Sequence, residues 1–128
     1  MAGVPILIVD DNAANLKLAR ILLRGEGYDV RTAADAEEGL RILSEWKPRV
    51  ILMDIQLPGM DGLELTRRLK ADRSTSDIII LALTAYAMKG DEERARAAGC
   101  DGYVAKPIDT DALPILIRKH LASKSESL

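Results

Sequence analysis

Four short apolar runs, separated by longer segments with helical periodicity, constrain the fold of this 128-residue chain more than any other feature. The runs cover residues 6–9, 50–53, 78–83 and 102–105 and are rich in β-branched and aliphatic side chains. Because successive positions are apolar, the runs predict strands that are covered on both faces. Residues 28–32 alternate in polarity, which favours a fifth, shorter strand at an edge of the sheet.

The segments between these runs have the spacing and the capping residues of helices. Asn12 is placed to cap the first helix and Asp35 the second, where Glu38 gives a start that resembles a capping box. Pro48 is expected to close the second helix, because proline cannot continue a helix. Asp91 is the candidate cap of the fourth helix, whose interior apolar residues are all alanines. Since alanines bury little area, this helix is predicted to be the least firmly anchored.

The last helix has two candidate caps, Asp109 and Asp111. Pro114 favours a start at Asp111, because proline fits the first turn of a helix. The polar tail, residues 123–128, is expected to be frayed. Strand and helix thus alternate five times, which predicts an α/β fold with a parallel five-stranded sheet, right-handed crossovers and helices on both faces. No linker divides the chain, so residues 1–128 are expected to form a single domain.

Composition excludes several classes of protein. With 18 basic and 20 acidic residues, one Trp, three Tyr and no Phe, the chain lacks the basic and aromatic surface of a nucleic-acid-binding protein. Its longest apolar run is far shorter than the roughly 20 residues that span a bilayer. The start has no secretory signal pattern, so we expect a cytoplasmic protein without membrane insertion. A single cysteine, Cys100, excludes an internal disulfide.

Polar residues with complementary chemistry end four of the five predicted strands. In an open parallel sheet, ligands bind beyond the carboxyl ends of the strands. The residues found there are Asp10 and Asp11 after the first strand, Asp54 at the end of the third, Thr84 at the end of the fourth and Lys106 after the fifth. The fold therefore predicts that these five side chains meet at one edge of the sheet.

This set of side chains indicates a site for a metal ion and a phosphoryl group. Three carboxylates so close together repel one another unless a cation lies between them. Mg²⁺ takes oxygen ligands and is usually held by one or two carboxylates together with phosphate oxygens. A lysine and a hydroxyl aimed at the same point suit the oxygens of a transferred phosphoryl group. Each residue also has an ordinary structural explanation, as a cap, a loop residue or a solvated side chain, but those explanations do not account for four strands at once.

Four motifs at compatible spacing resemble those of two-component response regulator receiver domains. They are VDDN (residues 9–12), LMDIQLPGMDG (52–62), LTAYAMKGD (83–91) and YVAKP (103–107). The resemblance covers nearly the whole chain and is similar in detail to DivK-type single-domain regulators and to the receiver domains of hybrid histidine kinases. It implies the doubly wound, flavodoxin-like and CheY-like strand order 2-1-3-4-5.

The resemblance also implies a role for each site residue. Asp54 would accept a phosphoryl group from a partner's phosphohistidine and would act as the nucleophile. Mg²⁺, or Mn²⁺ in its place, would be bound directly by Asp11, by Asp54 and by the backbone carbonyl of Gln56, while Asp10 would bind it through water or assist Asp11. Lys106 would pair with the phosphoryl oxygens.

Further residues would control switching and the lifetime of the phosphoryl group. The resemblance implies that Thr84 moves to bond the phosphoryl group and that Tyr103 turns into the space left behind. Gln56 and Tyr86 occupy the positions that tune the lifetime, and a bulky Tyr86 is expected to slow self-dephosphorylation by shielding the acyl phosphate.

The chain is expected to depend on protein partners. Its one histidine, His120, is predicted to be a solvated residue of the last helix, so the phosphoryl donor must be a histidine kinase or a histidine phosphotransfer protein. A downstream protein target would read the switch, and the chain itself would be a monomer or a weak dimer. The resemblance implies a cis Lys106–Pro107 bond and places donor docking at Asn15, Leu16, Pro107 and Ile108. For Leu16 and Ile108, simple core packing is the alternative.

Two other functions fit the same architecture less well. A phosphatase with an aspartyl-phosphate intermediate would place a second acid two residues after the nucleophile, where this chain has Gln56, and no inserted segment encloses a small substrate. A flavodoxin-like module needs a phosphate cradle, whereas the first loop, DDNAAN, would repel a phosphate. We therefore expect a switch that dephosphorylates slowly, not a turnover enzyme. The sequence leaves open whether it is a stand-alone regulator or an excised receiver domain of a hybrid kinase.

Overall fold

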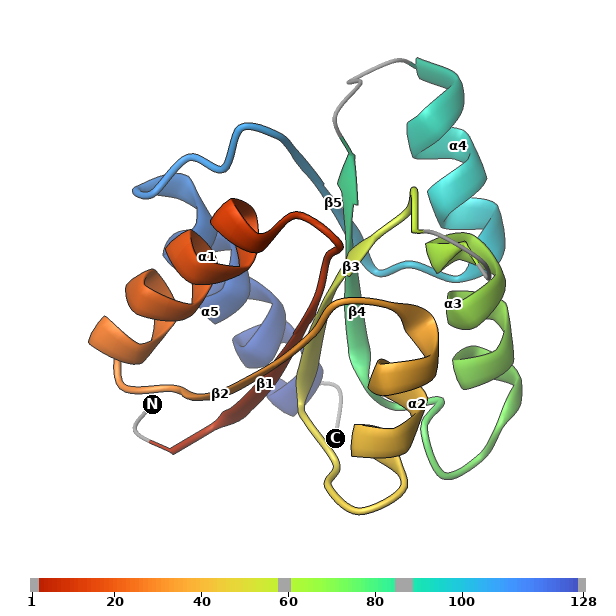
Figure 1. Cartoon of the computed structure of the whole chain (residues 1–128). Helices are drawn as coiled ribbons and strands as arrows, with labels where there is room; N and C mark the ends of the chain where they lie inside the picture. The colour runs from red at the N-terminus through yellow and green to blue at the C-terminus, as the bar shows by residue number, and fades with distance from the viewer. Residues whose placement is uncertain (1–2, 58–60, 85–88, 127–128) are drawn as a thin grey trace.

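Strands and helices alternate in the computed structural model, which describes residues 3–57, 61–84 and 89–126 (Figure 1). The strands are β1 (Pro5–Val9), β2 (Asp29–Ala33), β3 (Val50–Asp54), β4 (Ile79–Thr84) and β5 (Gly102–Ala105). The helices are α1 (Ala13–Gly25), α2 (Ala36–Leu43), α3 (Gly62–Ala71), α4 (Lys89–Ala98) and α5 (Ala112–Glu126). The strands are parallel and form one sheet in the order β2-β1-β3-β4-β5, so the predicted fold and strand order are confirmed.

The sheet lies between two apolar cores, one on each face. Figure 1 shows α1 and α5 on one face and α2, α3 and α4 on the other. In β1, Leu7 and Val9 belong to the core with α2, α3 and α4, whereas Ile6 and Ile8 belong to the core with α1 and α5. Neighbouring residues of a strand face opposite sides of the sheet, and a core covers each side. Every position of the run is therefore apolar, which explains why the apolar runs are uninterrupted.

Two predicted helix caps are confirmed. At the start of α1, Asn12 Oδ1 accepts the N–H of Asn15 at 3.0 Å. At the start of α2, Asp35 Oδ1 accepts the N–H of Glu38 at 2.8 Å, and the Glu38 carboxylate accepts the N–H of Ala34 at 3.2 Å. The bonds to Asn15 and Glu38 satisfy backbone donors that a helix start leaves without a partner, and the bond to Ala34 fixes the residue before the cap.

Two predicted helix boundaries are wrong. Helix α4 begins at Lys89, so Asp91 lies within its first turn and is not the cap. An acidic residue suits both positions, because each lies near the positive end of the helix dipole. Helix α2 ends at Leu43, five residues before Pro48, and Ser44 forms its C-cap. Pro48 therefore belongs to the connection that leads into β3.

Helix α5 begins at Ala112, directly after Asp111, and Pro114 lies in its first turn as predicted. The capping side chain is nevertheless Asp109, whose Oδ1 accepts the N–H groups of Asp111 and Ala112 at 2.9 and 3.0 Å. The helix continues to Glu126, so part of the tail expected to be frayed is helical; no proline or glycine interrupts it. None of the described helices is long and apolar enough to cross a membrane.

His120 is half-buried and not solvated as predicted. Its imidazole lies against Gly102 of β5, where a β-carbon would be only 2.8 Å from Nε2. The missing side chain at Gly102 therefore makes room for the ring between α5 and the sheet.

Candidate functional site

Asp10 and Asp54 lie side by side because of the register of the sheet. In the β1–β3 pair Val9 is opposite Met53, and an aspartate follows each of them. One carboxylate oxygen from each of Asp10, Asp11 and Asp54 lies within 4.8 Å of the other two. The predicted meeting of three carboxylates at the carboxyl edge of the sheet is confirmed.

Lys106 directly follows β5, and its side chain reaches this cluster across the end of β4. Its backbone N–H donates to the Thr84 carbonyl at 2.7 Å, which continues the β4–β5 ladder. Its ammonium nitrogen lies 2.9 Å from Asp10 Oδ2 and 3.1 Å from Asp54 Oδ2. The other oxygen of each carboxylate accepts a backbone N–H two residues further along the chain, at 2.9 Å in both cases. Both buried carboxylates are thus held in place from two sides.

Burial and ion pairing have opposite effects in this cluster. Burial raises the pKa of Asp54, which is 4% exposed, and the N–H of Gln56 and the Lys106 ammonium offset that rise only in part. Burial lowers the pKa of Lys106, but the carboxylates of Asp10 and Asp54 outweigh it and hold this pKa above its ordinary value. Lys106 is therefore charged at neutral pH, whereas burial opposes the charge on Asp54.

The cluster suits a divalent cation. Three carboxylates and one ammonium leave an excess of two negative charges when all are ionised. Asp10 Oδ2 is buried, and its one close cationic partner within the described part of the chain is the Lys106 ammonium at 2.9 Å. Asp11 is exposed beside it. Carboxylate oxygens with solvent on one side match the needs of Mg²⁺, which keeps several waters.

The family model for the response regulator receiver domain matches residues 6–118. The chain belongs to this receiver domain family. Among its relatives, the polar-differentiation response regulator DivK of Brucella anthropi is 44% identical over 116 residues, which are 91% of this chain and 94% of that protein. The resemblance indicated by the four motifs is confirmed.

Solved receiver domain structures share the fold. A CheY-like response regulator receiver domain protein from Methanospirillum hungatei is 32% identical with a TM-score of 0.90, over 99% of this chain and 100% of that chain. The receiver domain of a sensor histidine kinase from Pseudomonas aeruginosa, with a magnesium ion coordinated in its active site cleft, is 36% identical with a TM-score of 0.84. That match covers 92% of this chain and 97% of the other.

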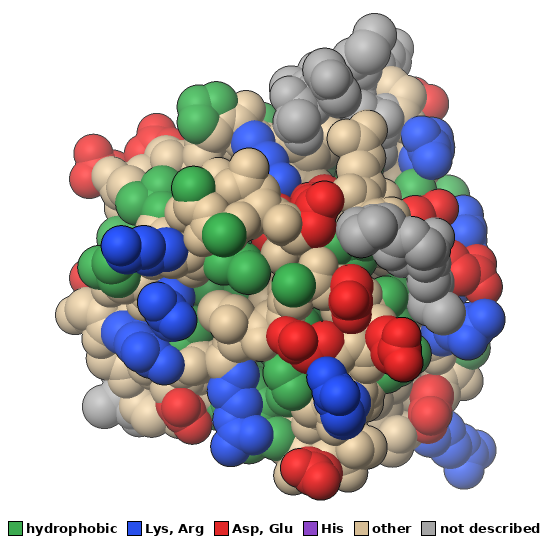
Figure 2. All heavy atoms as spheres, in the orientation of Figure 1, with side chains coloured by type: hydrophobic (Ala, Val, Ile, Leu, Met, Phe, Trp, Pro, Cys, Tyr) green, Lys and Arg blue, Asp and Glu red, His purple; other side chains and the backbone are tan. Residues whose placement is uncertain are grey.

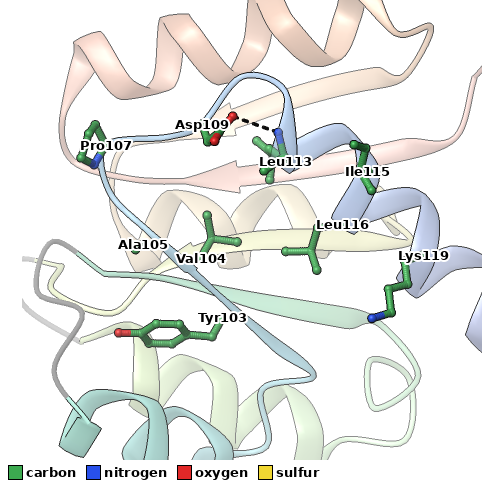
Figure 3. A pocket seen from close by; sticks show the side chains of 10 residues that line it. Tyr103, Val104, Ala105, Pro107, Asp109, Leu113, Ile115, Leu116 and Lys119 are labelled. Carbon is green, nitrogen blue, oxygen red and sulfur yellow. Dashed lines mark hydrogen bonds between the residues drawn. The ribbon is translucent and has the colours of Figure 1, made fainter.

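The other predicted site residues of the receiver domain differ in how far they are buried. Thr84 is buried at the end of β4. The side chain of Gln56 is exposed. Tyr103 is half-buried on β5, where it lines a largely apolar groove of about 590 Å³ between β5 and α5 (Figure 3). Tyr86 lies outside the described residues, so its predicted shielding role stays a prediction.

The predicted docking residues of the receiver domain are divided between surface and core. Pro107 is exposed and follows a cis Lys106–Pro107 bond, whereas Asn15 and Leu16 are half-buried. Ile108 is 7% exposed and belongs to the core with α1 and α5, which favours core packing for this residue; its docking role stays a prediction. Burial of this aliphatic side chain in the core stabilises the fold, because it removes apolar surface from water.

Sequence reasoning missed an exposed apolar pair on α1. Leu18 is 41% and Ile21 59% exposed, and the two are three residues apart on the helix. Lys17, Arg20 and Arg24 accompany them, and α1 has no acidic residue. Figure 2 shows basic and apolar side chains gathered over this helix. The exposed pair could have been predicted from the sequence, because α1 has more apolar residues than one buried helix face can hold.

Proposed function

We propose that this receiver domain accepts a phosphoryl group on Asp54 from the phosphohistidine of a histidine kinase or histidine phosphotransfer protein, with Mg²⁺ or Mn²⁺ bound beside it. One observation carries the proposal: the ammonium of Lys106 lies between the buried carboxylates of Asp54 and Asp10. The acceptor oxygen, metal ligands and a cation for the phosphoryl oxygens therefore share one small site. Receiver domains as a family work with histidine kinases and downstream targets, which supports this assignment.

The chain's own residues supply most of what the transfer needs. A carboxylate oxygen of Asp54 attacks phosphorus, the bond from phosphorus to the donor's histidine nitrogen breaks, and the electron pair returns to the imidazole. Lys106 pairs with the phosphoryl oxygens, and the Thr84 hydroxyl donates to one of them. The proposed metal ligands, which would hold Mg²⁺ so that it neutralises phosphoryl charge, are the carboxylates of Asp10, Asp11 and Asp54 and the carbonyl of Gln56.

The proposed output is a conformational switch, not catalytic turnover. Thr84 is buried, so drawing its hydroxyl toward the phosphoryl group would free space that the Tyr103 ring can enter. That movement would reshape the groove between β5 and α5, which a downstream target could read (Figure 3). Because Asp54 is only 4% exposed, water reaches the acyl phosphate slowly, and Gln56 and Tyr86 would tune that access.

Intact-mass spectrometry after incubation with acetyl phosphate tests the proposal directly. We expect a single phosphoryl adduct that requires both Mg²⁺ and Asp54. Asp54→Asn should give none, whereas Asp61→Asn, which changes the exposed cap of α3, should behave like the parent chain. An adduct that persists in Asp54→Asn, or that forms equally well in EDTA, would overturn the proposal.

We further propose that the phosphodonor docks on α1. The helix starts at Ala13, and its cap Asn12 directly follows Asp11, so a partner that presents a histidine to Asp54 must lie across this helix or the loop after β5. Leu18 and Ile21 offer this partner apolar contact, and the basic side chains of α1 favour an acidic surface around the donor histidine.

Replacing Leu18 and Ile21 by aspartate separates docking from chemistry. With a phosphorylated histidine phosphotransfer domain that labels the parent chain, we expect transfer to the double variant to slow at least about tenfold, because two apolar contacts would be replaced by charges that an acidic partner surface repels. Labelling by acetyl phosphate should be unchanged. Ile115→Asp is the matched control, since Ile115 is 59% exposed on α5. Unchanged transfer to the double variant would exclude docking on α1.

The cellular context is part of the same proposal. The one cysteine, Cys100, is buried and free, which fits a reducing cytoplasm. Both a stand-alone regulator and the receiver domain of a sensor kinase are similar to this chain. The chemistry proposed for Asp54 is the same in either context.

A further inference from the structure

Gly62, the first residue of α3, lies directly against the backbone of Asp54. A β-carbon at Gly62 would be 2.0 Å from the Asp54 carbonyl oxygen, 2.8 Å from the Asp54 carbonyl carbon and 2.9 Å from Ile55 Cα. All three atoms are backbone atoms, so no flexible side chain can move aside. Gly62 is helical and is not among the glycines with positive φ, which means that space and not backbone conformation demands a glycine here.

Helix α3 is not free to retreat from this contact. Leu63 and Leu65 are 2% and 0% exposed in the core beneath the helix. The Thr66 hydroxyl donates to the Gly62 carbonyl at 2.8 Å, and Asp61 caps the first turn. A side chain at Gly62 would therefore have to displace the end of β3.

We propose that Gly62 is a positioning residue for the phosphoacceptor: its close approach sets the Asp54–Ile55 peptide and, through it, the Asp54 carboxylate and the backbone of Gln56. The link is short, because the N–H of Gln56 holds Asp54 Oδ1 at 2.9 Å. Real β-carbon contacts stay above 3.0 Å, so alanine would move this backbone by about 1 Å. This inference rests on the proposed function, in which Asp54 accepts the phosphoryl group and Gln56 supplies a metal ligand.

The test compares Gly62→Ala with the parent chain in two measurements. Mn²⁺ binding is followed by the loss of the free-ion EPR signal, and phosphorylation by acetyl phosphate is followed by intact mass. A displacement of about 1 Å is expected to slow phosphorylation about 100-fold. The Mn²⁺ dissociation constant is expected to rise at least about tenfold, as for other groups that orient metal ligands.

Gly102→Ala is the matched control. Its β-carbon would also be crowded, but by side-chain atoms of His120 and Leu81 at 2.8 Å, at the end of β5 away from Lys106. A purely structural role for Gly62 would lower the number of Mn²⁺ sites along with the folded fraction seen by circular dichroism, and would leave the dissociation constant unchanged. That result, or a phosphorylation rate like that of the control, would overturn the proposal. A parent chain that neither binds Mn²⁺ nor is phosphorylated would instead overturn the proposed function.

Thr66 provides a second test that holds even if Gly62→Ala fails to fold. Thr66→Val removes the bond to the Gly62 carbonyl without adding an atom beside Asp54 and is expected to weaken Mn²⁺ binding. Thr66→Ser keeps the hydroxyl and should bind Mn²⁺ like the parent. Equal dissociation constants for the two Thr66 variants would contradict the positioning role.

Discussion

Lys106 is the residue on which the buried acids depend. It is the single cation in contact with Asp10 and Asp54 among the described residues, and its side chain is 14% exposed. Losing the ammonium would leave two buried carboxylates unpaired, whereas losing one carboxylate leaves a matched pair. The resting site is thus short of positive charge, which is the condition in which a divalent cation binds.

Asp54→Asn should stabilise the chain at neutral pH in EDTA. Burial raises the native pKa of Asp54 above its unfolded value, so this group's contribution to stability is present in full below about pH 4 and is lost as the pH rises through the native pKa. We expect the free energy of unfolding of the variant to exceed the parent's by about 1 kcal/mol at pH 7. The difference should shrink toward zero below about pH 4.

Urea unfolding monitored by circular dichroism at pH 7 and pH 4 measures this effect. Asp11→Asn is the control, because Asp11 is exposed and its loss should change stability by no more than about 0.5 kcal/mol. A less stable Asp54→Asn at pH 7 would show that the ion pair with Lys106 outweighs burial.

Helix α4 is held mainly by its C-terminal end. Within the described residues it buries only Ala95 and Ala98, and Ala97, expected inside, is exposed. Just beyond it, the Lys70 ammonium lies 2.8 Å from Asp101 Oδ2 and donates to the Ile78 carbonyl at 2.7 Å. This contact, with Asp101 also accepting a backbone N–H of β4, fastens the turn after α4 to α3 and the sheet.

Lys70→Met should loosen that turn. The Ile78 carbonyl loses a donor in a partly buried place, so we expect a loss of about 1–3 kcal/mol in stability. Hydrogen exchange by mass spectrometry should show faster exchange at residues 99–103 and unchanged exchange in α1. Lys47→Met is the comparison, because the Lys47–Asp77 pair is exposed and worth about 1 kcal/mol or less. Equal effects of the two variants would argue against a fastening role.

At the scale of the whole molecule, the sheet places an acidic site at one edge and keeps it there. The parallel register puts one carboxylate beside another, and the two cores hold β1 and β3 rigidly on both faces. The packing of the rest of the fold therefore holds the carboxylates of the site together against their mutual repulsion. Anything that binds the native site and not the unfolded chain must raise global stability.

Mg²⁺ should accordingly stabilise the whole domain. At ten times its dissociation constant, a ligand of the native state adds about 1.4 kcal/mol to the free energy of unfolding. Urea unfolding with MgCl₂, compared with NaCl at equal ionic strength, measures the gain. Asp11→Ala removes an exposed ligand without touching the core and should abolish it. A gain that survives in Asp11→Ala would place the cation elsewhere.

Much of this architecture could be predicted from residue type and order. The apolar runs are continuous because both faces of a parallel sheet are buried, and this pattern indicates the fold without reference to contacts. The polar residues that end the runs then meet at one edge by topology alone, which is why Asp10, Asp54 and Lys106 could be predicted together. The choice between Asp109 and Asp111 as the cap of α5 could not be predicted in this way, because the two positions are only two residues apart and both carry aspartate.

By itself, then, the sequence determined the order of strands and helices, the two buried faces and the identity of the acids and the lysine at the site. Tertiary structure alone decided which side chains are covered. It buried Ile108, exposed Leu18 and Ile21, and brought Gly62 against the backbone of Asp54. The physical reason is that periodicity reports which way a side chain points, whereas burial and close approach depend on how elements distant in sequence come to rest on one another.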